Sequence, residues 1–187
     1  MYFRQGIQSH PHLWPSLLVG LILCFSNGVD ARAGDVVESV GDILQYVLPA
    51  TAAGITIVHK DGQGAWQLAE SAALAMGVTY GLKYSVDETR PEGGSRSFPS
   101  AHTSISFSAA EFLRKRYGWQ YGVPVYAAAM FVAYSRVESK EHYTHDVLAG
   151  VVIGIASSYL LTEPFQKWRL QPDIGSRYLG IRINGYW

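Results

Sequence analysis

The chain contains one cysteine among its 187 residues, and this residue, Cys24, lies near the N-terminus. Because the rest of the sequence has no cysteine, it can form no disulfide, thiol nucleophile or cysteine metal site. Charge is also scarce, because only 16% of the residues are Asp, Glu, Lys or Arg, with 15 basic and 15 acidic side chains. No basic stripe interrupts this balance, which argues against nucleic acid as a partner.

Long uninterrupted apolar runs are missing as well, although 48% of the residues are hydrophobic. The two longest runs, residues 43–58 and 147–162, would each reach about 24 Å as helices at ~1.5 Å per residue, short of a ~30 Å hydrocarbon core. We therefore expect a compact helical domain that rests against a membrane surface, with insertion into the membrane as the alternative.

The N-terminal segment has the features of a signal peptide. Arg4 supplies positive charge, residues 17–25 form a short apolar core, and Ala31-Arg32-Ala33 has the small-x-small form of a cleavage site. This pattern predicts a signal peptide over residues 1–33 and a single domain over residues 34–187. The protein is then expected to be exported, periplasmic or membrane-associated. An uncleaved membrane anchor is the alternative.

The remaining sequence predicts an all-α fold. Helices are expected over residues 43–58, 66–84, 101–117, 123–137 and 146–161. Pro49 is expected to kink or interrupt the first of them. Residues 87–100 have the Pro- and Gly-rich composition of a loop, and Ser100 is positioned to cap the helix that follows. The C-terminal tail alternates polar and apolar residues in a strand-like way.

Three short clusters of ionisable residues lie at the ends of these helices. They are Lys83, Arg90 and Pro91; then Pro99, Ser100, Ala101 and His102; and finally Ser135, Arg136, His142 and Asp146. Each cluster has an ordinary explanation when taken alone. The cations suit a solvated loop, and the spacing of four between His142 and Asp146 suits a surface pair on a helix.

Taken together, the clusters contain the groups that phosphoryl transfer needs. Such a site requires fixed cations for the phosphate oxygens, a nucleophile and a proton donor for the leaving group. Arginine offers a planar fork that matches phosphate, and a helix N-terminus adds backbone N–H donors. On a helix, Asp146 lies one turn after His142, where its carboxylate fixes the imidazole tautomer.

The spacings resemble those of the type 2 phosphatidic acid phosphatase (PAP2) superfamily. That superfamily includes lipid phosphatases, bacterial class A acid phosphatases and vanadium haloperoxidases. Its pattern is lysine, six residues, Arg-Pro; then Pro-Ser-Gly-His; then Ser-Arg, five residues, His, three residues, Asp. All three spacings fit this chain, and only Ala101 departs from the pattern, in place of glycine. The resemblance implies a helical bundle of the PAP2 and haloperoxidase type.

The resemblance also implies a role for each matching residue. His142 is the expected nucleophile, which forms a phosphohistidine, and Asp146 orients it. His102 is the expected general acid, and later the base that activates water. The phosphate oxygens would be held by Lys83, Arg90, Arg136, Ser100 and the backbone N–H of Ala101. No cofactor and no metal ion are implied.

Several nearby side chains have open or minor roles. His145 is expected at the rim of the site, and Glu141 is expected to be a solvated loop charge. Four aromatic residues, namely Trp66, Tyr84, Tyr134 and Tyr143, either line an acyl-chain groove or belong to the core, and aromatic residues more often belong to the core.

The predicted function is a metal-independent phosphatase acting on a phosphate monoester or diphosphate. The apolar composition favours a lipid phosphate, so the expected partners are a phosphorylated lipid or small-molecule substrate and a membrane surface. Two enzymatic alternatives remain, a soluble acid phosphatase with loose specificity and a vanadium-dependent haloperoxidase. A catalytically silent envelope protein is the third alternative, although no predicted catalytic position is missing.

Overall fold

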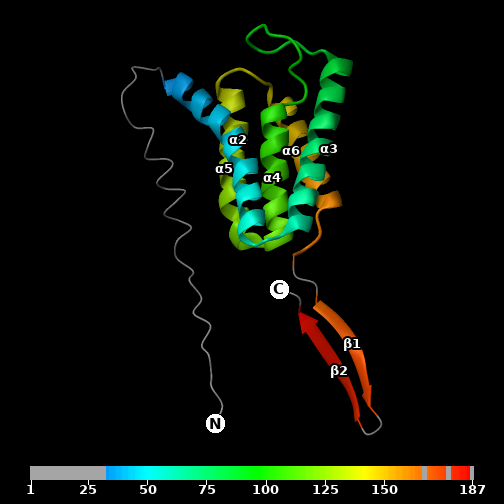
Figure 1. Ribbon diagram of the computed structural model, residues 1–187. Coiled ribbons are helices and arrows are strands. Elements are labelled where there is room, and N and C mark those ends of the chain that lie inside the picture. The colour runs from blue at the N-terminus through cyan, green and yellow to red at the C-terminus, as the bar shows by residue number, and fades with distance from the viewer. Residues whose placement is uncertain (1–32, 166–167, 176–177, 186–187) are drawn as a thin grey trace. The chain divides into compact units, whose positions relative to one another are not determined.

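The computed structural model describes residues 33–165, 168–175 and 178–185, and the predicted signal peptide and Cys24 lie outside these residues. Five α-helices precede a two-stranded antiparallel hairpin (Figure 1). They are α2 (Ala33–Val58), α3 (Gly62–Val86), α4 (Ala101–Tyr117), α5 (Trp119–Glu138) and α6 (Thr144–Leu161), and the strands are β1 (Trp168–Gly175) and β2 (Tyr178–Gly185). The hairpin pairs Trp168 with Gly185 and Gly175 with Tyr178, as the alternating tail suggested.

The predicted all-α bundle is confirmed, but four helices are longer than the sequence indicated. α4 has the predicted bounds, whereas α2 begins ten residues before position 43 and continues through Pro49. The first half of α2 mixes charged and apolar residues. Tertiary contacts hold it in place, because the Arg136 guanidinium donates to the backbone carbonyl of Glu38 and to the side chain of Asp42.

Helix α4 is the centre of the bundle and packs against α2, α3, α5 and α6. Its apolar side chains form the middle of the hydrophobic core, where Phe112 and Leu113 are fully buried. The other face of α4 carries buried serines. Their hydroxyls bond across helix boundaries, as in Thr79 Oγ1 to Ser104 Oγ at 2.9 Å and Ser108 Oγ to Ser158 Oγ at 2.9 Å. The core therefore combines apolar packing with satisfied polar contacts.

The contact between α4 and α6 depends on two glycines four residues apart. A Cβ atom at Gly150 would lie 2.7 Å from the backbone oxygen of Ser100, and one at Gly154 would lie 2.4 Å from that of Ser104. Small residues at this spacing let two helix backbones approach closely, a packing mode common between membrane helices. The same contact sets how near the start of α6 lies to the start of α4.

A buried ion pair closes the end of the bundle at which α2 joins α3. Arg116, in the last turn of α4, donates to both carboxylate oxygens of Asp61 at 2.7 and 2.6 Å. The Tyr117 hydroxyl donates to the same carboxylate at 2.7 Å. Burial alone would raise the pKa of Asp61, but the hydrogen bonds from Arg116 and Tyr117 lower it below its ordinary value.

The substitution Gly154→Ala is expected to destabilise the bundle by about 1–3 kcal/mol, because the new methyl group forces α6 away from α4. Gly77→Ala is the matched control, since a Cβ atom there meets nothing within 4 Å and alanine favours the helix by about 0.5–1 kcal/mol. Thermal unfolding midpoints of the two variants measure the difference. Equal midpoints would contradict the close α4–α6 contact.

Candidate active site

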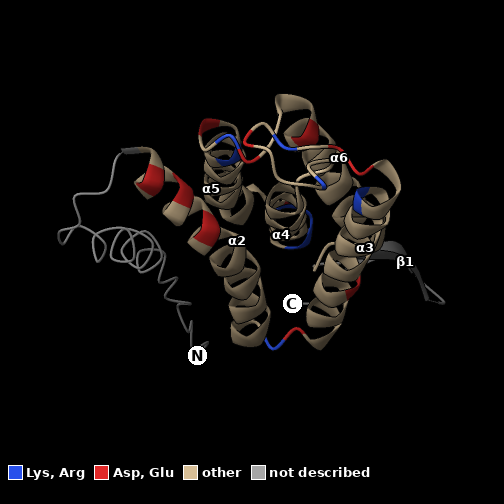
Figure 2. Ribbon diagram, turned by 90° about the horizontal axis from the view of Figure 1, so that it is seen from above, with Lys and Arg blue, Asp and Glu red and all other residues tan. Residues whose placement is uncertain are grey.

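The three sequence clusters come together at one end of the bundle. Because helices that follow one another in the sequence run in opposite directions, the end of α3, the start of α4, the end of α5 and the start of α6 all lie at this end (Figure 1). Seen from above, basic positions in the connecting loops and in α5 face acidic positions on the first half of α2 (Figure 2). Segments separated by more than fifty residues in sequence therefore meet in one place.

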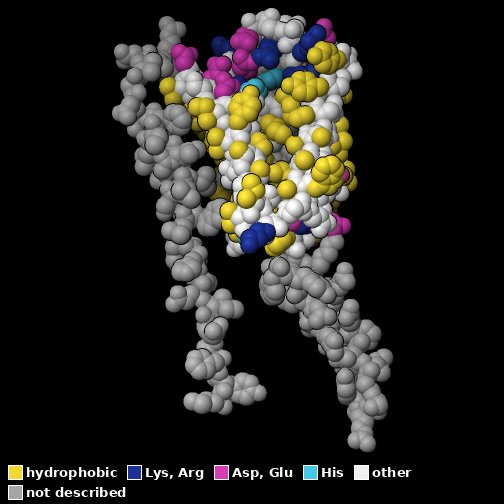
Figure 3. Space-filling view, in the orientation of Figure 1, with side chains coloured by type: hydrophobic (Ala, Val, Ile, Leu, Met, Phe, Trp, Pro, Cys, Tyr) yellow, Lys and Arg dark blue, Asp and Glu magenta, His cyan; other side chains and the backbone are white. Residues whose placement is uncertain are grey.

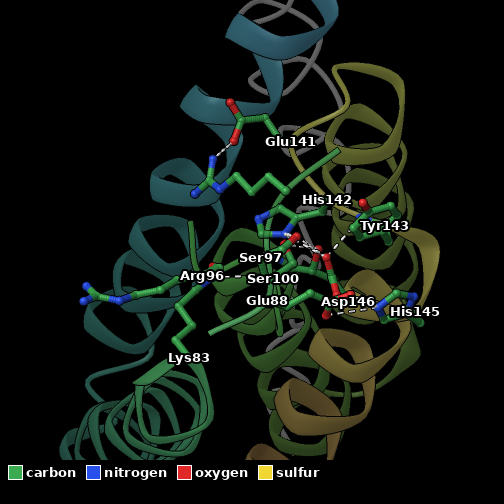
Figure 4. A network of polar contacts seen from close by, with 12 residues as sticks. Lys83, Glu88, Arg96, Ser97, Ser100, Glu141, His142, Tyr143, His145 and Asp146 are labelled. Atoms are coloured by element: carbon green, nitrogen blue, oxygen red, sulfur yellow. Dashed lines mark hydrogen bonds and ion pairs between the residues drawn. The ribbon is translucent and has the colours of Figure 1, made fainter. Parts of the chain in front are cut away.

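His142 and Asp146 form a buried pair, although not in the way that the spacing suggested. His142 lies in the connection that precedes α6, so the two residues do not share a helix. Asp146 is the third residue of α6, and its Oδ2 accepts the backbone N–H of Tyr143 at 2.9 Å, which closes a capping box. The chain thus turns back over the helix start, and His142 Nδ1 lies 3.4 Å from Asp146 Oδ2 (Figure 4).

Ser97 is a member of this network that the sequence did not reveal. Its hydroxyl donates to Asp146 Oδ2 and lies 3.4 Å from His142 Nδ1. Ser97 is fully buried, and its backbone N–H donates to the carbonyl of Glu88 at 2.7 Å. One carboxylate oxygen of Asp146 therefore joins the 87–100 loop to the start of α6. A serine in a loop carries no periodic signal, so only the folded chain identifies it.

The environment of His142 favours its neutral form. The side chain is almost completely buried, and this burial lowers the pKa of the imidazole to about 4. The positive charges of Lys83 and Arg90 act in the same direction, while the Asp146 carboxylate opposes them. A neutral imidazole whose Nδ1 faces Asp146 has its lone pair on Nε2, which is the arrangement that a histidine nucleophile requires.

Lys83 is buried in the last turns of α3 and holds the 87–100 loop. Its Nζ donates to the backbone carbonyls of Arg96 at 2.7 Å and Ser97 at 3.2 Å. The ammonium group thereby fixes the backbone on either side of the Ser97 hydroxyl. Its charge also acts on His142, as the lowered imidazole pKa reflects.

Arg136 and His102 share one carboxylate, that of Asp42 on α2. Arg136 is 1% exposed and donates to Asp42 Oδ1 at 2.8 Å, and His102 Nε2 lies 3.2 Å from the same oxygen. Arginine, histidine and carboxylate thus form a second cluster beside the His142–Asp146 pair. No sequence pattern indicates Asp42, because it lies in a long helix far from the three motifs.

Arg90 likewise carries a carboxylate partner. Its Nη1 pairs with Glu141, which is mostly buried, and lies 3.7 Å from Glu92. The expectation that Glu141 is a solvated loop charge is therefore wrong, because the turn before α6 points this side chain inward to Arg90. Two of the predicted phosphate-binding cations, Arg90 and Arg136, are thus paired with carboxylates, whose oxygens lie where phosphate oxygens are expected to bind.

Ser100 and Ala101 begin α4. Ser100 is fully buried and caps the helix, since its hydroxyl accepts the Thr103 backbone N–H at 3.4 Å and the Thr103 hydroxyl at 3.0 Å. The backbone N–H of Ser100 donates to the carbonyl of Asp146 at 3.1 Å, which ties the starts of α4 and α6 together. Ala101 is only partly buried and lies on the wall of the neighbouring cavity.

A cavity of about 600 Å³ opens beside these groups. Four of the predicted residues line it, namely Arg90, Ala101, His102 and Arg136, and the carboxylates of Asp42 and Glu141 lie beside them. The apolar part of its wall consists of Tyr46, Pro49, Met76, Tyr80 and Ile105. Lys83, Ser100, His142 and Asp146 are buried outside this lining. A larger cavity of about 700 Å³ lies at the other end of the bundle, around His59 and Tyr121, and contains none of the predicted residues.

Solved structures with the same fold include two phosphatases. The crystal structure of Aquifex aeolicus LpxE superposes with a TM-score of 0.61 at 21% identity, covering 76% of this chain and 92% of that chain. That of a transmembrane PAP2 type phosphatidylglycerolphosphate phosphatase from Bacillus subtilis gives a TM-score of 0.56 at 20% identity, covering 80% and 86%. At these identities the likeness establishes the fold.

Curated proteins give closer matches in sequence. The chain is 31% identical over 159 residues to a lipid A 4'-phosphatase of Helicobacter pylori, covering 78% of this chain and 80% of that protein. It is 35% identical over 107 residues to a lipid A 1-phosphatase of Porphyromonas gingivalis, of which it covers 24%. The profile of the PAP2 superfamily matches residues 64–170, which include all three motifs. The chain therefore belongs to the PAP2 superfamily.

Proposed function

We propose that this protein is a membrane-bound lipid phosphatase that hydrolyses a phosphate monoester of lipid A through a phosphohistidine on His142. The observation that carries the proposal is the buried His142–Asp146 pair next to a cavity lined by Arg90, His102 and Arg136. The reaction class, hydrolysis of a phosphoric monoester, is the one that the sequence predicted. The family and the lipid A phosphatases among its relatives bear it out.

The first chemical step is attack of His142 Nε2 on the phosphorus atom. The Asp146 carboxylate accepts a hydrogen bond from Nδ1–H and stabilises the positive charge that develops on the ring. Arg90 and Arg136 bind the phosphate oxygens, where charge accumulates in the transition state. His102 donates a proton to the leaving oxygen of the lipid, so the alcohol departs uncharged.

The second step reverses the role of His102. As a neutral imidazole it accepts a proton from water, which attacks the phosphohistidine and releases inorganic phosphate. Burial and the charge of Arg136 lower the pKa of His102 to about 4, which favours this neutral form, while Asp42, 3.2 Å from Nε2, opposes them. Each histidine therefore has its own carboxylate partner.

Substrate binding requires a rearrangement of two ion pairs. Asp42 and Glu141 hold the arginines that the phosphate needs, so the incoming phosphate competes with both carboxylates. Arginine has five N–H donors, and Arg136 uses its Nη1 for Asp42 and its Nη2 for the carbonyl of Glu38. A phosphate with two negative charges competes well against a single carboxylate.

The apolar half of the cavity supports a lipid substrate. Tyr46 and Pro49 on α2 face Met76 and Tyr80 on α3, with Ile105 of α4 between them. The space-filling view shows hydrophobic side chains lining the surface between α2 and α3 below the histidines (Figure 3). An acyl chain in this groove would keep its phosphate next to Arg90, His102 and Arg136.

The outer surface of the bundle supports insertion into the membrane. Two helices, α2 and α6, are long and apolar enough to cross a bilayer. Large apolar side chains are exposed along the helices, while charged groups gather mainly at the two ends (Figure 3). Such an exposed belt is rare on soluble monomers. It favours insertion over the docking that the short apolar runs suggested.

Exposed aromatic residues mark both ends of this belt. Trp66 and Trp119 lie at the end opposite the active site, and Tyr84, Tyr134 and Tyr143 lie at the active-site end. These side chains are exposed, so the expectation that they belong to the core is wrong for them. Trp66 and Tyr84 are separated by about 27 Å along α3 at ~1.5 Å per residue, close to the thickness of a hydrocarbon core. Trp and Tyr favour both membrane interfaces.

His142→Ala is expected to abolish phosphate release from lipid A, because the substitution removes the proposed nucleophile. Mass spectrometry of lipid A before and after incubation measures the loss of phosphate, with phosphatidate and nitrophenyl phosphate as comparison substrates. His59→Ala, at the opposite end of the bundle, is the control. Near-normal turnover by the His142 variant would refute the nucleophile assignment, and bromide oxidation with added vanadate would instead indicate a haloperoxidase.

His102→Ala is expected to slow turnover of an alkyl phosphate far more than that of nitrophenyl phosphate. The nitrophenolate anion leaves without a proton, whereas an alkoxide does not. Rates on both substrates, measured with the same enzyme preparation in detergent, give the comparison. An equal loss on the two substrates would contradict the role of His102 as a general acid.

The full-length protein is expected to stay in the membrane pellet after extraction with alkaline carbonate, since the exposed apolar belt is covered by lipid. Peripheral proteins held by charge are released by the same treatment. Immunoblots of pellet and supernatant measure the distribution, and release into the supernatant would contradict insertion.

A further inference from the structure

A second group of ligand atoms lies on the far side of Asp146 from His142. The Nε2 atom of His145 lies 3.0 and 3.2 Å from the two carboxylate oxygens of Glu88, and 3.1 Å from Asp146 Oδ1 (Figure 4). One ligand atom from each of the three residues lies within 4.8 Å of the others. An imidazole and two carboxylates therefore converge on one point.

The hydrogen-bond donors at this point are too few for the carboxylate oxygens of Glu88 and Asp146. The His145 Nε2 can carry a single N–H, which its geometry directs to Glu88. Asp146 Oδ1 is fully buried, and no residue in the described part of the chain hydrogen-bonds to it. The other oxygen of this carboxylate has partners in Ser97, His142 and the backbone of Tyr143. Oδ1 thus carries negative charge without a matching donor, a costly arrangement for a buried atom.

Packing holds the His145 ring in place without covering its nitrogen. The ring stacks on Tyr143 with the two centroids 5.3 Å apart, and its centroid lies 6.2 Å from that of Phe98. The His145 side chain is nevertheless 58% exposed. The Ser97 N–H donates to the backbone carbonyl of Glu88, and this hydrogen bond fixes the backbone from which the Glu88 side chain extends. The site is therefore open to solvent on the side of His145 and Glu88, and Asp146 Oδ1 forms its buried side.

We propose that Glu88, His145 and Asp146 form a site for a divalent transition metal of the Zn²⁺ type. Zn²⁺ binds imidazole nitrogen at ~2.0–2.1 Å and carboxylate oxygen at ~2.0–2.2 Å, so ligand atoms in a tetrahedral site lie about 3.3 Å apart. The contacts of 3.0 and 3.1 Å from His145 Nε2 need to lengthen by only a few tenths of an ångström. Water would supply the fourth ligand.

The site inhibits the enzyme, a consequence that rests on the proposed function. Asp146 would bind the metal through Oδ1 while Oδ2 faces His142, so the cation draws negative charge away from the imidazole. The carboxylate then stabilises a positively charged His142 less well in the first step. Metal binding and formation of the phosphohistidine therefore oppose each other through a single carboxylate.

Binding is tested on the full-length protein in detergent, without any substrate. Co²⁺ is added and its visible absorption bands are recorded, because tetrahedral N/O ligation gives intense bands that hydrated Co²⁺ lacks. Zn²⁺ is then titrated in. Stoichiometric growth of the Co²⁺ bands and their loss on addition of Zn²⁺ support the site, and an unchanged spectrum overturns it.

Two variants assign the ligands. Glu88→Gln and His145→Gln are each expected to weaken Zn²⁺ binding at least about ten-fold, since even outer-shell partners of a metal contribute ten- to hundred-fold. Asp87→Asn is the matched control: this exposed carboxylate is adjacent to Glu88, and asparagine tolerates its left-handed backbone conformation. Equal Zn²⁺ affinity in all three variants and the parent protein overturns the assignment.

Activity measurements separate the site from the proposed function. Phosphate release from the lipid is expected to fall when Zn²⁺ saturates the site and to be unaffected by EDTA. Glu88→Gln and His145→Gln keep the metal-free rate but need at least about ten-fold more Zn²⁺ for the same inhibition. A Co²⁺ spectrum without phosphatase activity on any substrate would refute the proposed function and leave the site intact. Activity that saturating Zn²⁺ leaves unchanged would overturn the inhibitory role.

Discussion

The active-site end of the bundle depends on one buried carboxylate. Asp146 closes the first turn of α6 through Tyr143, accepts the hydroxyl of Ser97 and faces the imidazole of His142. Its backbone carbonyl also receives the N–H of Ser100 at the start of α4. Two helix starts and two loops therefore share one residue. A charge this deeply buried is stable only when such partners surround it, so the same contacts that position the His142 imidazole also secure the local fold.

The close contact between α4 and α6 gives this network its rigidity. Gly150 and Gly154 bring the two backbones together, and hydroxyl groups such as those of Ser108 and Ser158 bond across the contact. The helix starts are thus held at a fixed separation by the whole length of the helices behind them. Catalytic groups on rigid elements keep their geometry better than groups on free loops, and the pair formed by His142 and Asp146 benefits from both helices.

The sequence predicted the helical fold and the residues of the three motifs, because strict spacing survives in the linear order. It did not predict Asp42 or Ser97, since neither belongs to a motif and their roles arise from contacts with residues dozens of positions away. The loop position of Glu141 predicts a solvated charge, yet its side chain turns inward to Arg90. The contact of His142 with Asp146 was expected from helical spacing, but it is made by a capping turn. Long-range pairing and turn geometry are what the sequence alone leaves undetermined.

The carboxylates opposite Arg90 and Arg136 have a consequence for product release. Free inorganic phosphate has to displace Glu141 and Asp42 to stay in the pocket, and it has no hydrocarbon chain to contribute binding energy of its own. A lipid substrate carries that chain and gains from the apolar wall formed by residues such as Tyr46 and Met76. Asp42 and Glu141 therefore compete equally with the lipid phosphate and with free phosphate for the arginines, whereas the apolar groove adds binding energy only for the lipid. The proposed function therefore implies a pocket that is selective for phosphate attached to lipid and that releases the detached ion readily.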